Sequence, residues 1–139
     1  MKVKFYLITM MMVFCAINLN AQGRFNPEKF KADLEKYITA EAGLTSAEAA
    51  KFYPLFHEMH EKQRSYYNKI REIKRSRPVG DSQCKKAISD MDKCDLQIKR
   101  LQIDYHNRML KIISAQKLYN VITAEENFHR QAMRRAAKR

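Results

Sequence analysis

Residues 45–81 read TSAEAAKFYPLFHEMHEKQRSYYNKIREIKRSRPVGD, and this stretch decides the fold. Thr45 and Glu48 have the spacing of a capping box, in which both side chains accept backbone hydrogen bonds at a helix start. Apolar and aromatic residues then recur in alternating steps of four and three, the pattern of a helix packed lengthwise on a neighbour. Pro54 predicts a kink, because proline removes one backbone donor. The members of this stripe are Phe52, Phe56, Met59, Gln63, Tyr66, Ile70 and Ile73.

A short turn follows at residues 77–81, and Asp81 or Ser82 is expected to cap the next helix. Two long helices joined by so short a turn must run antiparallel. The sequence therefore predicts a long antiparallel helical hairpin, with Phe56 and Ile70 buried in its seam. The third helix contributes a broad apolar stripe to that seam, comprising Ala87, Met91, Cys94, Ile98, Leu101, Tyr105, Met109 and Ile112.

Shorter helices are expected on both sides of the hairpin. Asn26 and Pro27 are the residue types of an N-cap and a first helical position, and Gly43 ends the helix that they begin. Ser114 is a candidate cap for a fourth helix. No Gly or Pro lies just before it, so one bent, continuous helix is the alternative. The sequence predicts an all-α fold of about four helices.

A second, narrow apolar stripe on the third helix comprises Leu96, Ile103 and Leu110, in steps of seven. At about 100° per residue it lies roughly opposite the broad stripe. The hairpin needs only one stripe, so the second needs another partner: the first or last helix, a second copy of the chain, or a client polypeptide. Lys99 and Arg100 are among the basic residues around it, which attract acidic segments at long range.

Residues 1–21 have the three-part pattern of a secretory signal peptide. A basic start precedes an almost uninterrupted apolar run of 13 residues, Phe5 to Ile17, and a polar stretch with a small residue at Ala21. The run is too short to span a bilayer, which needs about 20 residues, so a membrane anchor is the weaker alternative. We expect cleavage near Ala21, a periplasmic location and one mature domain, residues 22–139.

Net charge and composition limit the classes of function that the sequence allows. The 139 residues include 27 Lys and Arg against 15 Asp and Glu, a net charge of +12. In an exported chain, this excess favours contact with acidic polypeptides or an anionic membrane surface over nucleic acid. The sequence contains no nucleotide-binding glycine motif and no catalytic constellation, so we expect neither an enzyme nor a cofactor.

One metal site is worth testing. His57, His60 and Glu61 lie at i, i+3 and i+4 on one helix, so one face offers two imidazoles and a carboxylate to a metal ion. The alternative is that they are ordinary surface residues, because the sequence shows no second cluster of ligands.

Two cysteines lie on the third helix. Cys84 and Cys94 are ten residues apart, about 15 Å along a straight helix. A disulfide requires Cα atoms within about 7 Å, so we expect no bridge within one chain. A bridge between two subunits is the alternative.

Two helix starts resemble a known family motif. Leu44-Thr45-Ser46-Ala47-Glu48 and Ile113-Ser114-Ala115-Gln116-Lys117 are similar to the twice-repeated LTxxQ motif of the periplasmic Spy/CpxP family. The resemblance covers residues 28–135. Both copies depart from the pattern, since Glu48 and Lys117 replace the final Gln and the second copy has Ile-Ser for Leu-Thr. The motif positions are Leu44, Thr45, Glu48, Ile113, Ser114 and Lys117.

This resemblance implies a thin, all-helical cradle, often a homodimer, that binds non-native polypeptides without ATP or inhibits an envelope-stress sensor. The sequence therefore predicts a periplasmic chaperone-like or envelope-stress protein, with Leu96, Ile103 and Leu110 as its client or dimer surface. Two alternatives stay open. One is a metal- or stress-responsive partner of a membrane anti-sigma or kinase system, and the other is a helical structural protein on a membrane surface.

Overall fold

The computed structural model describes residues 25–138, and the expected signal peptide lies outside them. Over this range the protein is all-helical, with four helices and no strand, which confirms the predicted fold class. No helix in this range is long and apolar enough to cross a membrane. The helices are α2 (Pro27–Ala42), α3 (Ser46–Arg75), α4 (Asp81–Met109) and α5 (Ala115–Ala137).

The chain divides into two compact units, residues 1–31 and residues 32–139. The described part of the first unit holds the start of α2, where Asn26 Oδ1 accepts a hydrogen bond from the Lys29 backbone N–H at 3.1 Å. Pro27 is the first helical residue, as predicted. The second unit contains the rest of α2, the other three helices and every buried core side chain of the described range.

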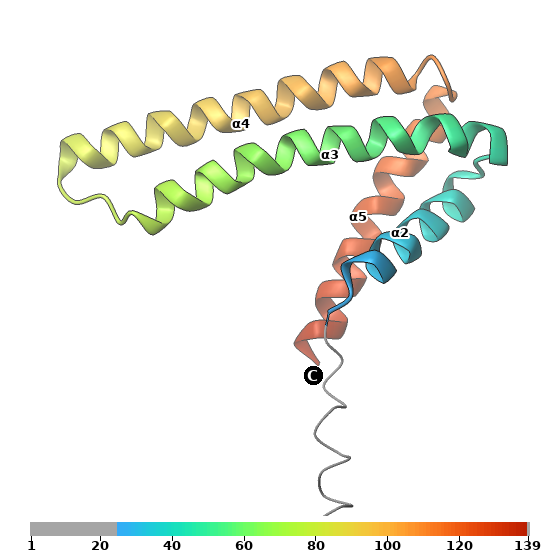
Figure 1. Ribbon diagram of the computed structural model, residues 1–139, viewed down its shortest axis with the longest axis horizontal. Helices are drawn as coiled ribbons and strands as arrows, with labels where there is room; N and C mark the ends of the chain where they lie inside the picture. The colour runs from blue at the N-terminus through green and yellow to red at the C-terminus, as the bar shows by residue number, and fades with distance from the viewer. Residues whose placement is uncertain (1–24, 139) are drawn as a thin grey trace, which may run out of the picture. The chain divides into compact units, whose positions relative to one another are not determined.

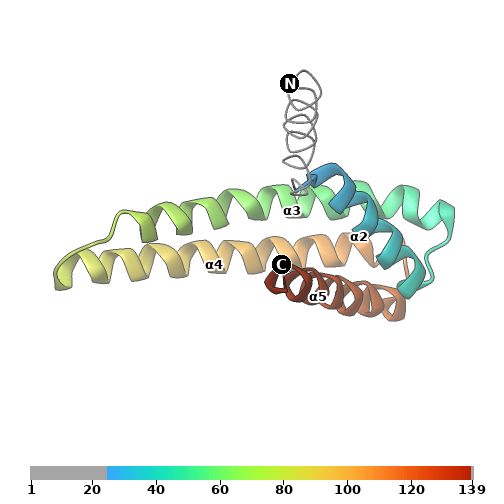
Figure 2. The same ribbon diagram turned by 90° about the horizontal axis from the view of Figure 1, so that it is seen from below.

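In the second unit, α3 and α4 lie side by side as the predicted antiparallel hairpin (Figures 1 and 2). Both halves of the predicted capping box are present at the start of α3. Thr45 Oγ1 accepts from the Glu48 backbone N–H at 3.2 Å, and Glu48 Oε2 accepts from the Thr45 backbone N–H at 2.8 Å. Helix α3 continues through Pro54 to Arg75 as a single element.

The start of α4 differs from the prediction. Gly80 is its N-cap and no side chain caps it, so neither Asp81 nor Ser82 has the expected capping role. Gly80 has a φ of 85°, in the left-handed region that glycine enters without steric cost. The backbone freedom of Gly80 therefore makes the turn into α4, without a side-chain cap.

The core lies at the end of the hairpin where α2 and α5 pack against it (Figure 1). Its largest fully buried side chains are Tyr105, Phe52, Phe56, Ile38, Met109 and Val121. The stripe on α3 is buried from Phe52 to Gln63, but Tyr66 and Ile70 nearer the α3–α4 turn are only half-buried. The prediction that Ile70 is buried is therefore wrong, because at that end two helices cover each other without a third layer from the described helices.

The last two helices are separate rather than one bent helix. Helix α4 ends at Met109, and a turn leads to Ser114, whose side chain accepts from the Lys117 backbone N–H at 3.2 Å. Ser114 is thus the N-cap of α5, as the sequence suggested. Ile113, at the first position of the second motif copy, is buried in the core.

The two residues that replace the final Gln of the LTxxQ motif, Glu48 and Lys117, contact each other. Lys117 Nζ lies 2.6 Å from Glu48 Oε2, the carboxylate oxygen that also completes the α3 capping box. One ion pair therefore joins the starts of α3 and α5, although the residues are 69 apart in the sequence. The hydrogen bonds from Lys117 and from the Thr45 backbone hold the pKa of the Glu48 carboxyl below its usual value.

We expect Glu48→Gln and Lys117→Gln each to lower the melting temperature at pH 7, because each change leaves the other charge without its counterion. The double variant should lower the melting temperature by less than the sum of the two single changes, since both charges are then gone. The stabilisation from Glu48 is present above its ordinary pKa of 4.5 and is lost as the pH falls through the lowered pKa of the folded state. In the Glu48→Gln variant, the melting temperature should therefore decrease less as the pH falls through this acidic range. Strictly additive losses in thermal melts would contradict a direct interaction.

Candidate functional site

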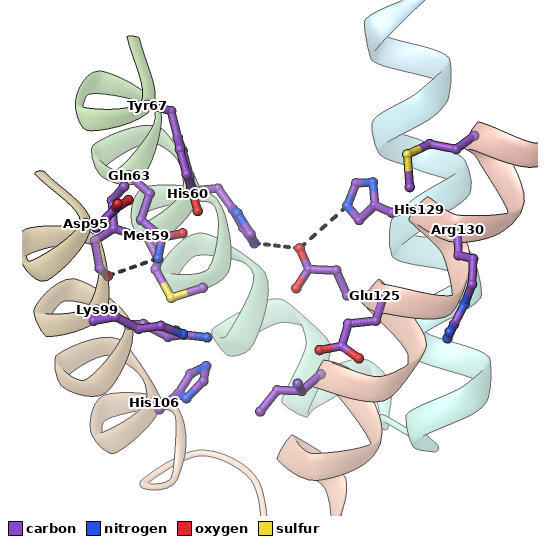
Figure 3. Close-up of a pocket in the computed structure, with 15 residues that line it drawn as sticks. Met59, His60, Gln63, Tyr67, Asp95, Lys99, His106, Glu125, His129 and Arg130 are labelled. Atoms are coloured by element: carbon purple, nitrogen blue, oxygen red, sulfur yellow. Dashed lines mark hydrogen bonds and ion pairs between the residues drawn. The ribbon is translucent and has the colours of Figure 1, made fainter. Parts of the chain in front are cut away.

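A groove of about 690 Å³ opens between α3, α4 and α5 (Figure 3). The buried side chains of Met59 and Ile98 line it from the hairpin seam. Tyr67 of α3 and Met133 of α5 also line it, and both are largely exposed to solvent. The groove thus offers apolar surface from all three helices.

A carboxylate and two imidazoles form the polar centre of this groove. His60 Nε2 of α3 lies 3.0 Å from Glu125 Oε1 of α5, and His129 Nε2 lies 3.7 Å from the same oxygen (Figure 3). His60 Nε2 is buried and makes no hydrogen bond of acceptable geometry within the described residues. Its contact with Glu125 links α3 to α5, and it is an ion pair only when the imidazole is protonated.

A third imidazole enters the groove from α4. Burial lowers the pKa of His106, while the Glu125 carboxylate opposes this shift and Lys99 adds to it. Lys99 lines the same groove and donates to Gln102 Oε1 at 3.0 Å. The folded protein therefore favours the neutral form of His106.

The His106 imidazole should contribute a loss of stability as the pH drops from 7.5 to 5.5. A lowered pKa in the folded state means that the unfolded chain takes up this proton first, so stability is full above the ordinary value of 6.5 and is lost below it. His106→Gln should remove this contribution, so the melting temperature of the variant relative to the wild type should rise as the pH drops over this range. A variant whose melting temperature falls as steeply as the wild type's would contradict this role.

The residues of the predicted metal site have different partners. His57 Nε2 lies 2.6 Å from Glu35 Oε1 of α2, whereas His60 pairs with Glu125 of α5. Glu61 is exposed to solvent. The structure does not bring His57, His60 and Glu61 together, and no group of three or more His, Cys, Asp or Glu side chains between residues 25 and 138 is placed to hold a metal ion. Carboxylates from two neighbouring helices hold the two imidazoles apart.

The narrow apolar stripe on α4 is open to solvent. Leu96, Ile103 and Leu110 are 51%, 61% and 44% exposed, so neither of the flanking helices covers them. The stripe borders the groove, because Asp95 and Gln102 line the groove and each precedes a stripe residue by one position, about 100° around the helix. Lys99 faces the groove and Arg100 is exposed beside the stripe.

Both described cysteines are free thiols on α4 and are half-buried. Cys84 Sγ lies 3.5 Å from the Pro78 carbonyl oxygen, which accepts a weak hydrogen bond from the thiol. Cys94 is on the seam side of the helix with Ile98. Neither thiol lines the groove.

The chain was compared with protein-family models, with curated proteins and with solved structures, and nothing matches in any of the three. The resemblance to the Spy/CpxP family therefore stays a prediction that depends on the two short motif copies.

Proposed function

We propose that the protein is an exported, ATP-independent chaperone-like or envelope-stress protein that binds non-native polypeptides. The observation that carries this proposal is the solvent exposure of Leu96 and Ile103 on one face of α4 and of Leu110 at its C-cap. These apolar side chains stand in steps of seven beside a groove, within a surface that carries an excess of positive charge.

The stripe suits weak, repeated contacts with an unfolded chain. Three isolated apolar side chains bury a modest area each, and the hydrophobic effect between them and a client does not depend on direction or sequence. Lys93, Lys99, Arg100 and Lys111 flank the stripe and are exposed to solvent. They attract acidic segments of a client over about 10 Å, and salt screens this attraction.

The groove adds partners for an unfolded backbone. Non-native segments present unpaired N–H and C=O groups, which lose free energy if they are buried without a partner. Gln102, Lys99 and the three imidazoles place donors and acceptors next to the apolar Tyr67 and Met133. The backbone of a client segment bound on the stripe can therefore form hydrogen bonds with these groove residues on the adjacent face of α4.

The test uses the chain from Gln22 to Arg139, which retains every buried core residue of the described range. We expect it to suppress the light scattering of a chemically unfolded enzyme diluted from denaturant, without nucleotide, and to do so less well at high salt. A protein of equal size and net charge without exposed apolar stripes is the control. No suppression at a tenfold molar excess would contradict the proposal.

A further inference from the structure

The turn between α3 and α4 concentrates positive charge. Residues 69–86 hold seven basic and two acidic residues, a net charge of +5 out of +12 for the whole chain. All seven basic side chains are exposed to solvent. They are Lys69, Arg71, Lys74, Arg75, Arg77, Lys85 and Lys86.

Most of this charge is not neutralised by the protein itself. Lys86 pairs with Asp90, at 2.5 Å between Nζ and Oδ2. Within the described range, Lys74, Arg75, Arg77 and Lys85 form no ion pair. The end of the hairpin therefore presents several free cations to a partner outside the chain.

An apolar side chain lies at the centre of these cations. Val79 is 78% exposed, more than any other large apolar residue of the described chain. It lies between Pro78 and Gly80 in the turn, at the end of the hairpin away from α2 and α5 (Figure 1). An apolar residue on a projecting turn is suited to enter a flat, deformable surface.

The chain retains a cation at Arg77, at a backbone position where glycine is usual. Arg77 has a φ of 47°, directly after the helix-ending residue Ser76, where glycine or asparagine is usual. A left-handed conformation is costly for a residue with a side chain, and such strain gathers at functional sites. The chain uses glycine for positive φ at Gly80, yet it retains a cation at Arg77.

We propose that this turn, residues 74–86, binds the surface of an anionic lipid bilayer. The free Lys and Arg side chains contact headgroup phosphates, and Val79 enters the boundary between headgroups and acyl chains. Membrane-surface segments combine these two features, because apolar burial and attraction to anionic lipid add to each other. The contact is separate from the stripe and groove, so it leaves the proposed client surface free.

The test is co-sedimentation of the chain from Gln22 to Arg139 with vesicles. We expect binding to phosphatidylcholine vesicles that contain one quarter phosphatidylglycerol, little binding to pure phosphatidylcholine, and release at high salt. The triple variant Lys74→Gln, Arg75→Gln, Arg77→Gln should bind about 100-fold more weakly at low ionic strength, at about fivefold per cation. Circular dichroism melts verify that both proteins are folded.

The matched control removes the same charge elsewhere. Arg130→Gln, Arg134→Gln, Arg135→Gln changes three exposed cations of α5 and should keep near-wild-type binding. An equal loss in both triple variants would show that net charge alone is responsible and would overturn the proposal. Equal binding of the wild type to both vesicle types would also overturn it.

Insertion is tested separately, because the chain contains no tryptophan. Val79→Trp should show a blue shift of its emission with anionic vesicles, whereas Tyr119→Trp, at an exposed position of α5, should not. No shift for Val79→Trp, together with displacement of the protein from vesicles by poly-glutamate, would identify the turn as a site for acidic polymers. That result would overturn the lipid assignment.

Discussion

Phe56→Ala should lower the free energy of unfolding by about 3–5 kcal/mol, the usual range for a large aromatic side chain lost from a core. Phe56 is 2% exposed, and its ring lies 5.6 Å from the Phe52 ring and 4.4 Å from the His60 ring, centroid to centroid. The cavity would lie in the core where α2 and α5 meet the hairpin. Since domains of this size are stable by about 5–15 kcal/mol, the variant should be near its unfolding limit. Urea denaturation followed by circular dichroism measures the loss.

Ile70→Ala is the matched control for this experiment. Ile70 belongs to the same stripe of α3 but is only half-buried, because α2 and α5 lie at the other end of the hairpin. We expect the free energy of unfolding to fall by about 1 kcal/mol, the centre of the distribution for point substitutions. Equal losses for the two variants would mean that the seam is equally buried along its length, contrary to the structure.

Replacing Leu96, Ile103 and Leu110 together by Ser should weaken client binding by about 100-fold, at about 1 kcal/mol for each apolar side chain that a client partly buries. Aggregation suppression should then disappear at equal concentration. The three residues contribute little to the core, so the helical signal and the melting temperature should stay near those of the wild type. The change is measured by light scattering with the same unfolded enzyme as for the wild type.

The control variant replaces Ile88 and Tyr119, which are exposed apolar residues outside the stripe, by Ser. It should retain suppression. Size-exclusion chromatography with light scattering then separates two roles of the stripe. Loss of a dimer with full suppression would make the stripe a subunit contact and contradict the client role, and loss of helicity would contradict its exposure in the monomer.

The hairpin could be predicted from the sequence because its signals are local. The capping box at Thr45 and Glu48 and the steps of four and three on α3 each involve residues within one or two helical turns. Periodicity identifies the face of a helix that packs, but not how deeply each position is buried. Ile70 shows this, since it shares the stripe with Phe56 and lacks the third layer that buries Phe56.

The groove could not be predicted from the spacing of residues in the sequence. His60, His106 and His129 come from three different helices, and no local pattern relates them. The spacing of His57 and His60 indicated a shared role on one helix face, but the packing of α2 and α5 gives each imidazole its own carboxylate. Helix geometry placed the narrow stripe opposite the broad one, but it did not decide whether a flanking helix covers it, and the structure shows that the described helices leave it exposed.

The ion pair between Glu48 and Lys117 has a consequence for the kinetics of folding. Its partners are 69 residues apart, with the whole hairpin between them, so the entropy of closing this loop must be overcome before the pair forms. Helices α3 and α4 need only local contacts, and their seam closes at smaller sequence separations, such as the 35 residues between Gln63 and Ile98, so the hairpin should form first. The pair then belongs to the late part of folding, and its removal should speed unfolding while leaving the folding rate nearly unchanged. In that case the two altered motif positions determine how long the native state persists rather than how fast it is reached.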